Sequence, residues 1–160
     1  MRKMFLTAIA AFAVAGLGMA ASAAPETAEK TVQVKEPSWL LRFADAQEAA
    51  KKENKVIFVN FTGSDWCPWC VRLNDEVLKK KAFLDYAGGS LILLKIDFPR
   101  RIPQTEEQKK SNRELAEKYG IRGFPTILLL DAEGKVIART GYRRGGAESY
   151  VKHLQQLLKK

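Results

Sequence analysis

Cysteine and histidine, the residues that build metal sites and disulfide frameworks, are scarce in this sequence. Its 160 residues include two cysteines and one histidine. The cysteines are Cys67 and Cys70, so the several structural disulfides common in small exported domains are excluded. A zinc site needs four ligands, and these cysteines with His153 supply three. Attachment of a c-type haem needs histidine directly after the second cysteine, where the sequence has Val71. We therefore expect no metal and no cofactor.

Methionine and long apolar runs are confined to the N-terminus. All three methionines lie within the first 19 residues, so the rest of the chain has no methionine for a metal site. The run from Met4 to Met19 follows the basic pair Arg2 and Lys3. Small residues come next, and this order is typical of a secretory signal peptide. The run is shorter than the roughly 20 residues of a spanning helix, and an uncleaved anchor helix is the alternative.

We predict a signal peptide over residues 1–23, a flexible linker over 24–36 and one folded domain over 37–160. Cleavage near Ala23 would release the protein to the periplasm or the medium, without stable membrane insertion afterwards. No cysteine lies near the cleavage site, so a lipid anchor is excluded.

Negative charge is also in short supply. The chain has 27 Lys and Arg against 18 Asp and Glu, a formal net charge of +9 at pH 7. The basic residues are spread over the whole chain without forming a single basic arm, and an exported protein rarely meets nucleic acid. We therefore predict no nucleic-acid partner, and only a weak attraction to acidic partners or anionic lipid surfaces.

Hydrophobic periodicity predicts one α/β layer domain. Two near-continuous apolar runs have the length of strands buried on both faces of a sheet. We expect strands over 56–61, 91–96, 126–130 and 135–140, the last two forming a hairpin. We expect helices over 37–53, 67–78, 105–119 and 147–158, the second continuing after a bend to Ala87 and ending at Gly88 and Gly89.

The two cysteines lie where a buried strand passes through a turn into a helix. The start of a helix stabilises a thiolate through free backbone N–H groups and the helix dipole. We expect Cys67 to be partly exposed there and to attack a partner disulfide. Cys70, one turn later, would face the core and resolve the mixed disulfide. Pro68 suits the first helical turn. A purely structural disulfide is the alternative, but it leaves this setting unexplained.

The chain resembles the thioredoxin superfamily. Residues 66–70 match its W-C-x-x-C motif, and residues 119–126 match the segment before its third central strand. The segments 61–67 and 97–100 are similar to an exported bacterial branch and to the thioredoxin-like domain of transmembrane disulfide reductases. The resemblance implies a central mixed sheet of four to five strands flanked by helices on both faces.

The resemblance also implies roles for the residues around the cysteines. Pro125 would be a cis proline packed against the disulfide, and the Phe124 backbone would pair with an extended substrate segment. Trp66 and Trp69 would form an apolar rim, with core packing as the alternative for Trp66. Pro68 and Trp69 would tune the reduction potential.

Three further residues are candidates for tuning the site. Many thioredoxins have a buried aspartate where this chain has Asn60, which cannot take up a proton. Lys95 matches the lysine that pairs with that aspartate. Alone, it would act on a nearby thiol electrostatically, or it would extend out from the strand end to solvent. Asn74 would either form a hydrogen bond near the disulfide or be an ordinary buried amide.

The function implied is thiol–disulfide exchange with exported protein thiols and disulfides. Similarity to reductase-linked domains favours a reductant or exchange protein over a strong oxidant, with an upstream electron donor of the membrane-reductase type. The alternative is a non-catalytic binding module that holds a partner in the groove near Pro125.

Overall fold

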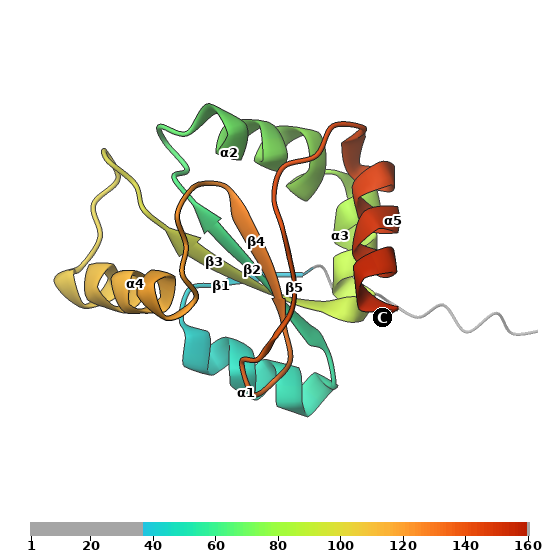
Figure 1. The fold of residues 1–160 in the computed structure, drawn as a ribbon, viewed down its shortest axis with the longest axis horizontal. Helices are drawn as coiled ribbons and strands as arrows, with labels where there is room; N and C mark the ends of the chain where they lie inside the picture. The colour runs from blue at the N-terminus through green and yellow to red at the C-terminus, as the bar shows by residue number, and fades with distance from the viewer. Residues whose placement is uncertain (1–36, 160) are drawn as a thin grey trace, which may run out of the picture. The chain divides into compact units, whose positions relative to one another are not determined.

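A five-stranded mixed sheet forms the centre of the domain in the computed structural model, which describes residues 37–159 (Figure 1). The strand order is β1-β3-β2-β4-β5, with β1, β3 and β2 parallel and β4 and β5 antiparallel to their neighbours. The strands are β1 (Trp39–Leu40), β2 (Val56–Thr62), β3 (Leu91–Asp97), β4 (Thr126–Leu130) and β5 (Val136–Thr140). The predicted fold class and the predicted hairpin are confirmed.

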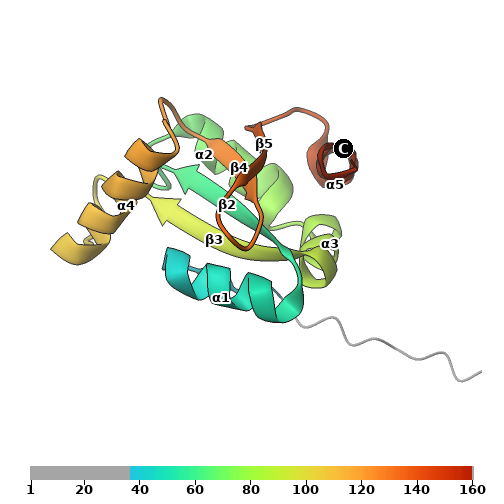
Figure 2. The same ribbon diagram turned by 60° about the horizontal axis from the view of Figure 1, so that its bottom comes forward.

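Helices cover both faces of this sheet. The first face is covered by α1 (Phe43–Glu53) and α4 (Glu106–Lys118), and the second by α2 (Pro68–Leu73), η1 (Asn74–Leu78), α3 (Lys81–Ser90) and α5 (Gly146–Leu158). In both views α3 and α5 lie side by side (Figures 1 and 2). None of the helices within residues 37–159 is both long and apolar enough to cross a membrane.

Alternation along β2 explains why both of its faces need cover. Successive side chains of a strand point to opposite faces. Ile57 and Val59 pack in the cluster that includes α1 and α4, whereas Phe58 packs with α3 and α5. All three side chains are at most 1% exposed. The strand therefore reads as a continuous apolar run.

The N-terminal part of the predicted first helix is a strand. Trp39 and Leu40 pair with Leu93 and Leu94 of β3, and α1 begins at Phe43. Trp39 and Phe43 are four residues apart, as on one face of a helix, but their side chains join different hydrophobic clusters. A free edge of β3 supplies hydrogen-bond partners that outweigh a weak local helical preference.

The predicted second helix also differs from the structure. It is interrupted after Leu73 by the π-helical turn η1, whose wider turn shifts the apolar stripe. Val71 is 42% exposed, while Leu73 is fully buried. The predicted stop at Gly88 and Gly89 is wrong, because α3 continues through both. Each glycine costs about 1 kcal/mol relative to alanine in a helix, which the packing of α3 against α5 offsets.

Candidate active site

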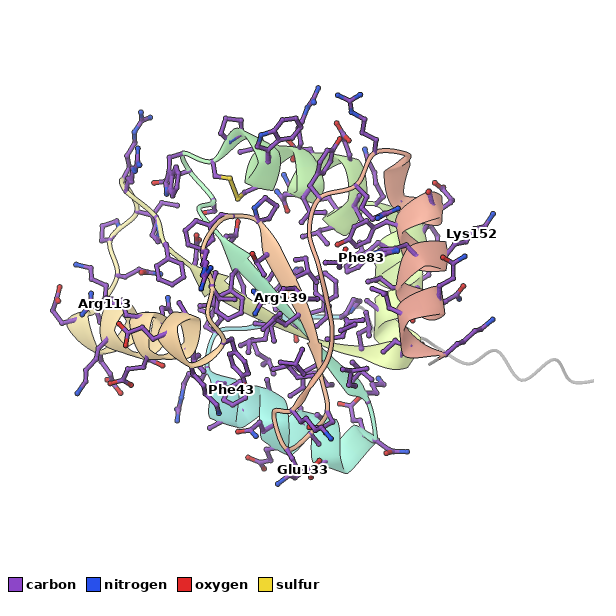
Figure 3. All side chains as sticks on the ribbon, in the orientation of Figure 1. Phe43, Phe83, Arg113, Glu133, Arg139 and Lys152 are labelled. Atoms are coloured by element: carbon purple, nitrogen blue, oxygen red, sulfur yellow. A yellow bond between two sulfur atoms is a disulfide. The ribbon has the colours of Figure 1, made fainter. Side chains whose placement is uncertain are left out.

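The two cysteines form a disulfide at the N-terminal end of α2, above the carboxyl ends of β2 and β3 (Figure 3). Their Cα atoms are 5.2 Å apart. After β2 the chain turns tightly, and the Cys67 N–H donates to the Gly63 carbonyl at 2.9 Å. Cys67 is the N-cap residue of α2, and Pro68 occupies its first turn as predicted. The sequence therefore placed the pair in the correct local structure.

Each sulfur accepts a backbone hydrogen bond. The Cys70 N–H donates to Cys67 Sγ at 3.3 Å, and the Gly63 N–H donates to Cys70 Sγ at 3.5 Å. After reduction these donors stabilise negative charge on the sulfur atoms. The expected partial exposure of Cys67 is wrong, because Cys67 is only 4% exposed and Cys70 only 3%. Burial of Cys67 follows from the chain segment that crosses beside it.

That segment is the predicted Phe124–Pro125 pair, and its peptide bond is cis, as the resemblance implied. Cys67 Sγ lies 3.6 Å from the Phe124 carbonyl oxygen. The two segments meet because Thr126, the first residue of β4, pairs with Phe61 near the end of β2. Pairing of β4 with β2 therefore places a stretch 57 residues away in sequence directly against Cys67.

Trp66 is packed against its neighbours and directly precedes Cys67, and its place in a substrate-facing rim stays a prediction. Its indole N–H donates to the Phe98 carbonyl at 2.7 Å, and its ring meets Phe124 edge-on at 6.0 Å. A Cβ on Gly63 would lie 2.5 Å from the indole. Glycine is therefore required at position 63, where no side chain fits beneath the ring.

Trp69 is more exposed than Trp66. It is 47% exposed and lies against Tyr142, with ring centroids 5.4 Å apart. The Tyr142 hydroxyl donates to the Glu76 carboxylate at 2.6 Å, and this hydrogen bond raises the pKa of Tyr142 above its ordinary value. Trp66 and Trp69 thus present apolar surface beside the disulfide.

A polar cavity of about 140 Å³ lies behind Cys70. Asn60 and Lys95 are register partners on β2 and β3, and both line this cavity. Asn60 is 6% exposed, and its Oδ1 has no hydrogen-bond partner among residues 37–159. Asn74 also lines the cavity, while its amide group donates to Asp75 at 3.5 Å. The three tuning candidates are therefore brought together with the second cysteine.

Sequence reasoning missed Asp97, which changes the interpretation of Lys95. Lys95 Nζ lies 2.9 Å from the Asp97 carboxylate, so this lysine is not a lone charge directed at a thiol. Asp97 is 8% exposed and accepts the Ser64 N–H at 3.0 Å and the Ser64 hydroxyl at 2.6 Å. Residues two apart on a strand share a face, and this spacing could have identified the pair.

His153 is half-buried, and its Nε2 lies 2.9 Å from the Thr140 hydroxyl. Burial lowers its pKa below the ordinary value. It has no contact with the disulfide in the structure. Within residues 37–159 no three His, Cys, Asp or Glu side chains are arranged to hold a metal ion.

The fold and the cysteine pair define a thiol–disulfide oxidoreductase. Residues 43–158 match the thioredoxin-like domain family, and the chain belongs to that family. The sequence is 42% identical over 117 residues to the disulfide bond reductase DsbH of Chlamydia pneumoniae, covering 73% of this chain and 70% of the relative. It is 29% identical over 103 residues to the thioredoxin-related protein DsbJ of the same organism, covering 64% of this chain and 30% of the relative.

Solved structures agree with this assignment. A structure of the DsbH oxidoreductase matches with a TM-score of 0.74 at 38% identity, covering 86% of this chain and 96% of the other. A putative disulphide-isomerase from Bacteroides thetaiotaomicron matches with a TM-score of 0.58 at 27% identity, covering 78% and 93%. The resemblance inferred from the two sequence motifs is thus confirmed at the level of family and fold.

Proposed function

We propose that this protein reduces or exchanges disulfides of exported proteins, with Cys67 attacking and Cys70 resolving. The observation that carries the proposal is the position of Cys67 Sγ, 3.6 Å from the backbone of a cis-proline segment and hydrogen-bonded by the N–H of Cys70. Cys70 Sγ lies against the turn residue Gly63 and the polar cavity. A substrate sulfur approaching between Trp66 and Trp69 reaches Cys67 first.

The reaction is two successive thiol–disulfide exchanges. In the reduced protein the Cys67 thiolate attacks one sulfur of the substrate disulfide, and the other substrate sulfur leaves as a thiolate. The Cys70 thiolate then attacks Cys67 Sγ and releases the second substrate thiolate. The Cys67–Cys70 disulfide forms, the substrate gains two electrons, and protons from solvent complete its two thiols.

The walls of the site suit an extended polypeptide. The Phe124 backbone offers hydrogen-bonding groups to a segment lying alongside it, as in addition of a strand to a sheet edge. Two residues of the wall, Pro68 and Pro125, have no backbone N–H to donate. Trp69 adds an exposed aromatic ring. Hydrogen bonds to the substrate backbone do not depend on the substrate side chains. This mode of binding therefore suits many protein substrates.

Direction and location complete the proposal. The relative DsbH bears the name of a disulfide bond reductase, which supports a reductant here, renewed by an electron donor of the membrane-reductase type. Export follows from the signal peptide predicted over 1–23. The signal peptide and the linker over 24–36 lie outside the described residues.

An activity assay in both directions tests this function. With dithiothreitol as the electron source, the purified protein should accelerate reduction of insulin disulfides over the thiol alone. The oxidised protein should not measurably accelerate disulfide formation in a reduced, unfolded substrate. Rapid stoichiometric oxidation of that substrate, with little insulin reduction, would refute the proposed direction. The Cys67→Ser/Cys70→Ser double variant gives the background rate.

A further inference from the structure

The loop after β3 carries two exposed arginines to the edge of the active site. The Asp65 carboxylate holds this loop by accepting hydrogen bonds from three consecutive backbone N–H groups. The donors are Arg100 at 3.0 Å, Arg101 at 2.6 Å and Ile102 at 3.3 Å. These hydrogen bonds hold the pKa of Asp65 below its ordinary value, and the bond from the Arg100 N–H has the largest effect. Because Asp65 precedes Cys67 by two residues, the loop is fixed to the turn that leads into the cysteine pair.

The Arg100 side chain lies over the ring of Trp66, which is itself held in place by its neighbours. Its guanidinium carbon is 4.1 Å from the centroid of the Trp66 ring. Trp66 is itself held by its hydrogen bond to Phe98 and by its contact with Phe124. A guanidinium stacked on an aromatic ring keeps its in-plane N–H groups free to bind a carboxylate with two parallel bonds. Arg100 is therefore oriented before any partner arrives.

Positive charge at this edge is not neutralised by other side chains of residues 37–159. Arg100, Arg101 and Arg122 are exposed, and none of the three forms an ion pair within residues 37–159. Arg122 lies two residues before Phe124, on the segment that borders Cys67. We name these three residues the arginine rim.

The carboxylates close to the site are already engaged. Asp65 is bound to backbone N–H groups, and Asp97 is buried against Lys95. Glu76 accepts the hydroxyl hydrogen of Tyr142. An approaching substrate therefore meets unpaired guanidinium groups, and charge of one sign around a cleft attracts the opposite charge.

We infer that the arginine rim binds acidic side chains flanking the target cysteine of a protein substrate, with Arg100 on Trp66 as the main anchor. The inference rests on the proposed function, because an extended segment beside Phe124 places its side chains within reach of the rim. It adds a preference for acidic segments to a site whose backbone pairing is indifferent to sequence.

Two synthetic peptides test this preference. Each contains one internal disulfide, and they differ only in carrying two glutamates or two glutamines beside one cysteine. Stopped-flow fluorescence gives their rates of reduction by the reduced protein, normalised to their rates with dithiothreitol. We expect the glutamate peptide to react roughly tenfold faster at low ionic strength, falling towards equal rates at about 1 M salt.

A charge-matched pair of variants locates the effect. Arg100→Gln, which removes one positive charge from the arginine rim, should lower the glutamate-to-glutamine rate ratio by roughly fivefold. Lys152→Gln is the control, because Lys152 is exposed on α5, away from the disulfide (Figure 3). It should leave the ratio unchanged.

The possible results separate the two proposals. Equal reduction of both peptides by the unmodified protein, or an unchanged ratio in the arginine variant, overturns the arginine rim and leaves the reductase function standing. Failure to reduce either peptide overturns the proposed function, and the preference that rests on it. A ratio that falls equally in the Lys152 variant also refutes the rim, because net charge alone would then explain it.

Discussion

Replacement of Cys70 by serine is expected to leave the protein covalently attached to its substrates. Cys67 still attacks a disulfide in this variant, but no second thiol is present to release the mixed disulfide. Cys67→Ser should instead lower disulfide reduction by roughly 10³-fold or more, because the one remaining thiol is Cys70, whose Sγ lies against Gly63 and the polar cavity. Non-reducing gel electrophoresis after incubation with a disulfide-bonded protein detects the trapped complex.

The double serine variant separates catalysis from simple binding. It keeps the groove beside Pro125 but has no thiol, so it should form no covalent complex and retain little affinity. Partner binding by this variant equal to that of the unmodified protein would favour the non-catalytic binding module. Trapping by Cys67→Ser but not by Cys70→Ser would reverse the two cysteine roles.

Replacement of Asp97 by alanine should reduce the free energy of unfolding by about 2–3 kcal/mol. The change removes the acceptor of two hydrogen bonds from Ser64 and leaves Lys95 without its partner. Lys95 has a side chain that is 34% exposed, so solvent screens part of the lost ion pair and the estimate stays below that of a fully buried pair. Urea denaturation of the reduced protein measures the difference.

A second lysine–aspartate pair supplies the control for this prediction. Asp85 pairs with Lys81 at 2.7 Å on the exposed side of α3, with side chains 59% and 86% exposed. Asp85→Ala should change stability by no more than about 0.5 kcal/mol. Asp97→Asn should fall between the two, since it keeps an acceptor for the Ser64 N–H. Equal effects of Asp97→Ala and Asp85→Ala would mean that the buried pair contributes nothing special.

The local setting of the cysteines was predictable because it depends on short-range rules. An apolar strand, a turn containing Gly63, and a proline after the first cysteine place Cys67 at a helix start without reference to the rest of the chain. Three strands, β2, β3 and β4, were equally predictable, because burial on both faces of the sheet leaves near-continuous apolar runs in the sequence.

The features that were predicted wrongly depend on contacts between residues that the sequence pattern does not reveal. Trp39 became a strand residue because the edge of β3 was available to it. Cys67 is buried because pairing of β4 with β2 brings Phe124 against it. The partner of Lys95 was sought at position 60, on the adjacent strand, whereas the carboxylate comes from Asp97 on the same strand.

In this protein the carboxylate near the cysteines is that of Asp97, which accepts hydrogen bonds from Ser64 in the turn before Cys67. In many thioredoxins the buried aspartate would instead stand at position 60. Ser64 and Lys95 both line the cavity behind Cys70. Asn60 supplies an uncharged acceptor at the same place. The carboxylate is therefore displaced towards the carboxyl end of β3, and among residues 37–159 Lys95 is the one charged side chain that lines the cavity.

The reduction potential of the Cys67–Cys70 pair tests the central claim most directly. It is obtained by equilibrating the purified protein with glutathione buffers and following the fluorescence of Trp66 and Trp69. A reductant of exported disulfides should have a potential of about −230 mV or lower, towards the thioredoxin end of the range. A potential near −120 mV, the value typical of a strong oxidant, would contradict the proposed direction.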